Sequence, residues 1–135
     1  MTSVKGIFAC GNVLHVHDLV DFVSAESRRA GQFACQYLND TLNSNEIEIK
    51  PSKNVRYVCP QKVDLKTGSQ IYLRTLVKKD DNILKVMLVD KNGQHEVKSL
   101  KLPHVQPSEM LNFLVKPDEL PADFSNEAYL SVSVE

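Results

Sequence analysis

A short polar turn near the N-terminus carries the residue types best suited to ligand binding. Gly11 and Asn12 follow an apolar run at residues 4–10, and residues 19–21 open the helical pattern that comes next. Glycine lets a ligand approach the backbone, and the amide of Asn12 offers both a hydrogen-bond donor and an acceptor. A helix start adds unpaired N–H groups and the positive end of the helix dipole. A strand, a glycine turn and a helix start in this order are typical of ligand sites in open α/β folds.

A second candidate is the pair His15 and His17, which Asp18 follows. On an extended segment both imidazoles would face one side, where they could bind a metal ion. The sequence shows no evident third ligand. We therefore expect a structural or substrate-facing role for these histidines and predict no metal site.

The three cysteines, Cys10, Cys35 and Cys59, are an odd number of widely spaced thiols. They fit a reducing compartment such as the cytoplasm better than a disulfide framework. Cys10 ends an apolar run, Cys35 lies inside a predicted helix and Cys59 lies in a predicted strand. We expect all three to be buried, inert thiols, and we predict no catalytic residue in this chain.

Length and charge exclude several classes of protein. The 135 residues allow one domain, or one small domain with an appendage, and are too few for a complete enzyme with two nucleotide-binding units. The net charge of −1 gives no field that would draw the chain to nucleic acid or to an anionic membrane. The apolar runs are too short for a membrane span, and the N-terminus does not resemble a signal peptide.

The sequence changes character near residue 45. Residues 4–10 predict a short buried strand, and residues 19–42 predict one helix that Asp18 caps and residues 43–45 end. The predicted helix carries an apolar stripe, formed by Leu19, Val20, Val23, Ala30, Ala34, Tyr37, Leu38 and Leu42 and widened by Phe22 and Phe33.

From residue 46 onward, apolar and polar residues alternate with the period of a β-strand. Six or seven short strands are expected, at residues 47–49, 55–59, 71–77, 84–88, 97–102, 111–115 and 130–134. Val97 falls out of phase and predicts a bulge, Asn92 and Gly93 predict a hairpin turn, and residues 78–81 predict a solvated hairpin tip. We therefore expect an α+β chain, in which a strand-loop-helix element over residues 1–45 precedes an antiparallel β-sandwich over residues 46–135.

The segment VKGIFACGNV at residues 4–13 resembles the last flavin-binding motif of the FAD-dependent pyridine nucleotide-disulfide oxidoreductases, in the thioredoxin reductase-like class. The segments HVHDLVD at residues 15–21 and VRYVCPQ at residues 55–61 look most like the members that accompany anaerobic glycerol-3-phosphate metabolism in bacteria. The chain departs from the motif at Asn12, where Asp is usual, and at Val20, where many members have Gln. It departs again at Glu26, where Gly is common.

The resemblance implies that residues 1–45 are a remnant of an FAD-binding domain. Gly11, Asn12 and Val13 would form the turn that holds the ribityl chain, and the backbone of Leu19, Val20 and Asp21 would face the flavin ring. The fingerprints for the rest of FAD and for NAD(P)H are absent from this sequence, so those parts would belong to another portion of the enzyme or to a partner subunit.

We therefore expect the C-terminal fragment or a subunit of a cytoplasmic bacterial FAD- and NAD(P)H-dependent oxidoreductase, inactive alone. Its β domain would serve oligomerisation or docking. Without the rest of the flavin domain, the apolar stripe must pack against the β domain or a second copy of the chain. This predicts a homodimer, formed for example by exchange of the strand-helix element. The alternative is a non-enzymatic β-sandwich interaction module with a vestigial flavin motif.

Overall fold

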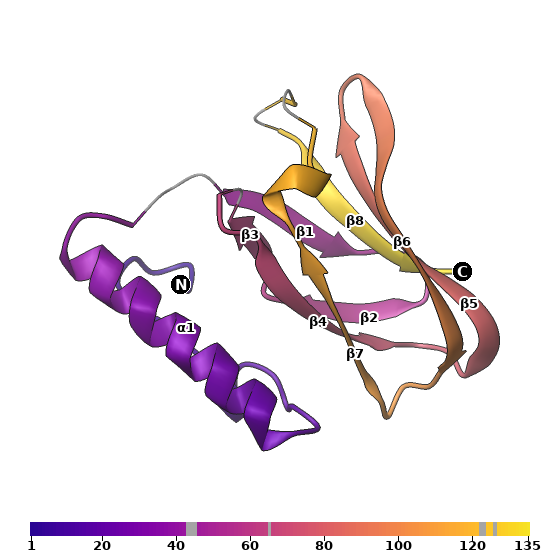
Figure 1. Ribbon diagram of the computed structural model, residues 1–135, viewed down its shortest axis with the longest axis horizontal. Helices are drawn as coiled ribbons and strands as arrows, with labels where there is room; N and C mark the ends of the chain where they lie inside the picture. The colour runs from indigo at the N-terminus through magenta and orange to yellow at the C-terminus, as the bar shows by residue number, and fades with distance from the viewer. Residues whose placement is uncertain (43–45, 65, 122–123, 126) are drawn as a thin grey trace. The chain divides into compact units, whose positions relative to one another are not determined.

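The computed structural model describes residues 1–42, 46–64, 66–121, 124–125 and 127–135 (Figure 1). The chain divides into two compact units, residues 1–44 and residues 45–135, which we call the N-terminal unit and the β unit. The N-terminal unit contains the single 3₁₀ turn η1 (Gly11–Val13) and the helix α1 (Val20–Leu38). No described helix has the length and apolarity needed to cross a membrane.

The predicted strand at residues 4–10 does not form. Instead the backbone N–H of Thr2 donates to the carbonyl of Ile7 at 2.8 Å, and Gly6 takes a φ of +81° within this turn. A lone strand would leave its backbone donors and acceptors without partners. The described part of the N-terminal unit has no second strand to pair with it, so a local turn satisfies some of these groups instead.

The start of α1 has no side-chain cap. The helix begins at Val20, and its N-cap residue is Leu19, whose side chain has no acceptor for the N–H groups of the first turn. The predicted cap at Asp18 is therefore wrong. Asp21 places an acidic side chain in the first turn, where it complements the positive end of the helix dipole.

α1 ends at Leu38, four residues earlier than predicted. Asp40 adopts a left-handed φ of +53°. The N–H of Asp40 donates to the carbonyl of Tyr37, and the N–H of Thr41 donates to the carbonyl of Gln36 at 2.8 Å. These two bonds form a Schellman motif, which ends the helix before the predicted stop. That stop, at residues 43–45, lies outside the described residues.

The β unit contains two sheets with the strand orders β3-β1-β8-β5-β6 and β2-β4-β7 (Figure 1). The larger sheet consists of β1 (Glu46–Pro51), β3 (Lys62–Asp64), β5 (Lys79–Asp90), β6 (Gly93–Val105) and β8 (Tyr129–Val134). The smaller sheet consists of β2 (Val55–Cys59), β4 (Ser69–Thr75) and β7 (Met110–Val115). A second 3₁₀ turn, η2 (Pro117–Glu119), follows β7.

The predicted α+β class is confirmed, but the single antiparallel sandwich of six or seven strands needs correction. The described residues form eight strands, because the sequence pattern missed β3, which is only three residues long. β1 and β8 pair in parallel, with Ile49 opposite Leu130, so the larger sheet is mixed. Alternation within one strand does not reveal the direction of its neighbour, so this pairing escaped prediction.

The β5–β6 hairpin confirms two predictions and corrects a third. The predicted hairpin is present, but its two-residue loop is Lys91 and Asn92, and Gly93, with a φ of +136°, already begins β6. The register shifts where β6 passes Val97, which is the extra residue of the predicted bulge. The predicted hairpin tip at residues 78–81 is wrong, because β5 begins at Lys79 and pairs with β6 from that residue onward.

Residues from both sheets form one hydrophobic core. The predicted alternation is confirmed in β4, β5 and β8, whose inward-facing residues are buried. The larger sheet contributes Ile47, Ile49, Val63, Leu84, Val86, Leu88, Val105, Leu130, Val132 and Val134, and the smaller sheet contributes Val55, Val58, Ile71, Leu73, Phe113 and Val115.

Candidate functional site

The predicted ligand turn forms η1. Gly11 is buried and has a φ of +69°, a conformation that favours glycine. Its carbonyl accepts the N–H of Leu14 at 2.9 Å and the N–H of His15 at 3.1 Å. Asn12 and Val13 are both exposed. The turn therefore presents the Asn12 side chain at the surface, directly after a buried glycine.

The side chain of Glu26 in α1 forms a hydrogen bond with the backbone of this turn. The backbone N–H of Gly11 donates to Oε2 of Glu26 at 2.7 Å, and Nε2 of His17 lies 3.0 Å from the same oxygen. Glu26 is 8% exposed and is the one buried residue of α1, all of whose residues are described. A buried carboxylate needs hydrogen-bond donors to offset the loss of water. One oxygen thus joins η1, the following loop and the helix.

His15 and His17 are buried, and their rings meet edge to face with centroids 4.5 Å apart. Nε2 of His17 is directed at Glu26, and the ring of Phe22 lies 6.4 Å from that of His17. Among the residues that the structure describes, no group of three or more His, Cys, Asp or Glu side chains is placed to hold a metal ion. The geometry assigns the two histidines a structural role in the loop between η1 and α1.

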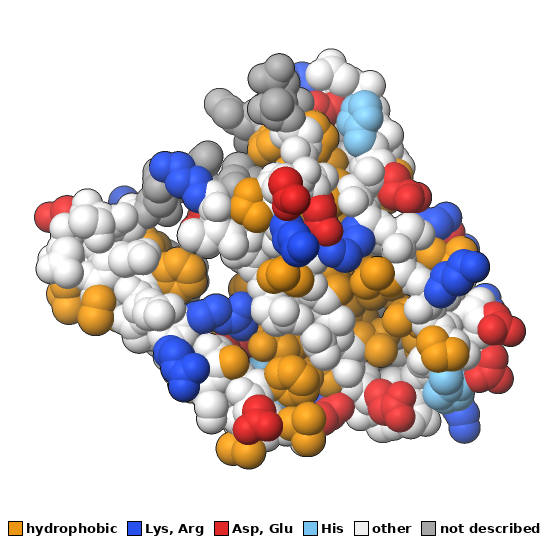
Figure 2. Space-filling view, in the orientation of Figure 1, with side chains coloured by type: hydrophobic (Ala, Val, Ile, Leu, Met, Phe, Trp, Pro, Cys, Tyr) orange, Lys and Arg blue, Asp and Glu red, His pale blue; other side chains and the backbone are white. Residues whose placement is uncertain are grey.

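The remaining predicted site residues lie at the exposed start of α1. Leu19 is 58% exposed, Val20 is 74% exposed, and Asp21 is also exposed. Together with the turn they form what we call the N-terminal apolar surface, made up of Val13, Leu14, Val16, Leu19 and Val20. Figure 2 shows hydrophobic side chains on the surface near the start of α1. Contiguous groups of exposed apolar side chains are typical of binding surfaces, so these residues are candidates for one.

The predicted apolar stripe of α1 is present, but none of its members is buried. The expectation of three buried thiols is wrong for Cys35, which is exposed, whereas Cys10 is half-buried and Cys59 is buried. None of the three cysteines, all of which are described, forms a disulfide bond. A position inside a helix implies burial only where a second element covers that face of the helix.

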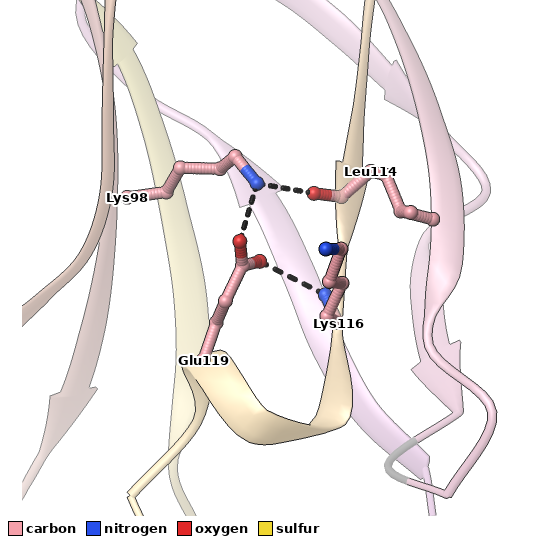
Figure 3. Close-up of polar contacts among 4 residues, drawn as sticks. All are labelled: Lys98, Leu114, Lys116 and Glu119. Carbon is pink, nitrogen blue, oxygen red and sulfur yellow. Dashed lines mark hydrogen bonds and ion pairs between the residues drawn. The ribbon is translucent and has the colours of Figure 1, made fainter.

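A polar cluster in the β unit links β6 to the end of β7 (Figure 3). Nζ of Lys98 donates to the carbonyl of Leu114 at 2.8 Å and contacts Oε1 of Glu119 at 2.5 Å. Oε2 of Glu119 accepts the N–H of Lys116 at 2.9 Å. Burial acts to raise the pKa of Glu119, but the bonds to Lys98 and Lys116 and their positive charges outweigh it, so the pKa lies below its ordinary value. The cluster protects a carbonyl on an edge strand.

A pocket of about 420 Å³ lies on the β5–β6 hairpin, lined by Asp81, Asn82, Ile83, Lys101, Leu102 and Pro103. None of these residues belongs to the ligand turn or to the start of α1. The pocket is therefore separate from the predicted site.

The sequence pattern does not reveal the role of Glu26. Its spacing from Val23 and Ala30 places a charged residue within the apolar stripe of the helix. A charge at such a position signals a buried carboxylate that needs partners. Its partners could not be found this way, because Gly11 contributes a backbone N–H and no recognisable side chain.

Comparisons with models of protein families, with curated proteins and with solved structures each found no match.

Proposed function

We propose that this chain supplies the last flavin-binding segment of an FAD- and NAD(P)H-dependent oxidoreductase and is inactive alone. The observation that carries the proposal is the N-terminal apolar surface, which includes residues of the Asn12 turn and of the start of α1. Exposure of so many apolar side chains to water is unfavourable. We therefore expect a ligand or another polypeptide to cover them. The motif resemblance at residues 4–13 and 15–21 names that ligand as a flavin.

The residues of the turn and the helix start have the chemistry that a flavin requires. The Asn12 amide can exchange hydrogen bonds with the hydroxyls of a ribityl chain. The N-cap residue Leu19 supplies no side-chain cap, and N–H groups at a helix start are suited to the polar, electron-rich edge of an isoalloxazine ring. When bound, the flavin would supply electron transfer with a nicotinamide, which would bind on another portion of the enzyme.

Asn12 makes this contact weaker than a carboxylate would. A neutral amide forms hydrogen bonds about half as strong as charged ones. Val20 has no polar side chain, so only its backbone can form a hydrogen bond with the flavin ring. We therefore propose a flavin site that depends strongly on the part of the enzyme outside this chain.

We further propose that the β unit is a sandwich-type domain for docking or oligomerisation. Its two sheets enclose their own core, so it needs no partner to bury its apolar side chains. A homodimer or a complex with an FAD-binding subunit would cover the N-terminal apolar surface. The free thiols of Cys10 and Cys35 suit the reducing cytoplasm of a bacterium.

Co-expression with a separately encoded FAD- and NAD-binding protein from a neighbouring gene tests the proposal. We expect a yellow complex that retains flavin through gel filtration. Asn12→Leu should weaken flavin retention by up to about tenfold, the value of one neutral hydrogen bond. Gln32→Leu is the matched control, because Gln32 is exposed on α1 away from the turn, and it should leave retention unchanged.

The self-contained core of the β unit favours a second candidate, a non-enzymatic protein-interaction module with a vestigial flavin motif. The same experiment separates the two. A complex that forms without flavin, and that Asn12→Leu leaves unchanged, supports the module. A complex that loses its yellow colour with Asn12→Leu supports the flavoprotein.

A further inference from the structure

We propose that Glu26 is a positioning residue that fixes the Asn12 turn relative to the start of α1, so that both present their hydrogen-bonding groups to one ligand. The identification of that ligand as a flavin rests on the proposed function. The contact of Glu26 with the turn does not, and it can be tested on the chain alone.

One carboxylate oxygen reaches both segments that flank the ligand groups. Oε2 of Glu26 accepts the N–H of Gly11, the residue directly before Asn12. The same oxygen meets Nε2 of His17, two residues before Leu19, the N-cap of α1. Glu26 itself lies in the second turn of that helix. Its side chain therefore closes a ring that runs from the turn through the loop to the helix.

The fully buried groups of the described N-terminal unit centre on Glu26. The unit's buried residues, among those described, are Gly11, His15, His17 and Glu26, which all belong to this one cluster. No hydrophobic side chain of the described N-terminal unit is buried. In most domains apolar packing fixes a loop against a helix. Here hydrogen bonds to a carboxylate, which are stronger than neutral ones, act together with half-buried ring contacts such as that of Phe8 with Tyr37.

The arrangement also defines what each substitution removes. Glu26→Leu fills the space but leaves the N–H of Gly11 without this acceptor, which costs more than the bond itself contributes. Glu26→Gln keeps an oxygen at the same reach and removes only the charge. Arg28→Gln is the control, because Arg28 is exposed on the same helix and the substitution also changes the charge by one.

Amide hydrogen exchange of the full ¹⁵N-labelled chain, followed by NMR, tests the contact. We expect exchange at the Gly11 amide to be at least about tenfold faster in Glu26→Leu and intermediate in Glu26→Gln. The ring ¹⁵N signals of His17 should shift in both variants. Arg28→Gln should change neither. Unchanged amides of β5 and β8 show that the β unit remains folded. Wild-type exchange at Gly11 in both Glu26 variants would overturn the proposal.

The ligand arm uses FAD with the co-expressed partner described above. We expect Glu26→Gln to lower flavin retention and to shift the flavin absorption bands, whereas Arg28→Gln should do neither. Faster exchange at Gly11 with unchanged retention and bands would overturn the positioning role. A wild-type complex without flavin would overturn the proposed function, and the exchange measurement would then decide the Glu26 contact by itself.

Discussion

The two units of this protein place their apolar side chains in opposite ways. The β unit buries its apolar side chains between two sheets, whereas the buried residues of the described N-terminal unit form a polar cluster around Glu26. Among the residues that the structure describes, nine of the eleven exposed large hydrophobic residues lie in the N-terminal unit, and the other two, Leu76 and Leu114, lie in the β unit. The β unit is therefore held by a buried apolar core, whereas the fully buried contacts of the described N-terminal unit are hydrogen bonds and the contact between two histidine rings.

This difference predicts unequal stability along the chain. Segments with few buried apolar contacts open at low free-energy cost, while core strands open only with global unfolding. Segments that bind ligands are commonly drawn from the less stable part of a protein. The exposed start of α1 fits that pattern, and the substitutions below test it from the largest expected effect to the smallest.

The largest difference between the two units is expected when one leucine in each unit is replaced by alanine and the losses in the free energy of unfolding are compared. Leu88 of β5 is 0% exposed, and Leu38 at the end of α1 is 80% exposed. Leu88→Ala should lower the free energy of unfolding by about 2–5 kcal/mol, because it removes buried methyl groups and leaves a cavity. Leu38→Ala should change it by less than about 0.5 kcal/mol. Urea denaturation of both variants measures this, and equal losses would contradict the contrast between the units.

A pair of glycine substitutions sharpens the same comparison. Gly68 has a φ of +71°, and a Cβ there would lie 2.3 Å from the carbonyl oxygen of Val115. Gly68→Ala should therefore destabilise the β unit by about 2–3 kcal/mol. Gly31 lies in the middle of α1 with nothing near its Cβ position. Gly31→Ala should stabilise the helix by up to about 1 kcal/mol.

Thermal denaturation monitored by circular dichroism measures both glycine effects. Destabilisation by Gly31→Ala would show that this face of the helix is packed closely by another element or another chain.

The smallest effect is expected at the Lys98–Glu119 cluster of the β unit, where polar contacts only supplement packing. Glu119→Gln should cost about 1 kcal/mol at pH 7. The pKa of Glu119 is lower in the folded chain than its ordinary value of 4.5. The stabilisation is therefore complete above that ordinary value and is lost as the pH falls through the lower, folded-state pKa.

Urea titrations of wild type and Glu119→Gln at pH 7 and pH 3 check this dependence. The difference between the two proteins should shrink at pH 3. A difference that stays constant across this range would assign the effect to packing of the side chain and not to its charge.

The regular part of the β unit was predictable from the sequence because each strand buries one face. The alternating pattern correctly predicted that Ile71 and Leu73 in β4, and Leu84 and Leu88 in β5, face inward. Val97, which is out of phase with that pattern, correctly predicted the bulge in β6. The parallel pairing of β1 with β8 was not predictable, because it joins segments about 80 residues apart. The short β3 has too few residues for a period to emerge.

The N-terminal unit was harder to predict because its apolar residues do not report burial. Val4 and Ile7 suggested a buried strand, yet both are more than half exposed. Apolar residues form a buried strand only where another strand pairs with them, and the described N-terminal unit contains no strand. The Gly11 turn was located correctly, but its anchor on Glu26 depends on a backbone N–H, which no residue type reveals.

Hydrogen exchange of the full chain, measured by mass spectrometry without and with the FAD-containing partner, tests the central claim most directly. In the chain alone, we expect α1 to exchange at least about a hundredfold faster than β5 and β8. With the partner bound, residues 11–38 should become protected while β5 and β8 stay unchanged. Equal protection of α1, β5 and β8 in the chain alone would contradict the claim that the N-terminal unit is less stable than the β unit until a partner binds.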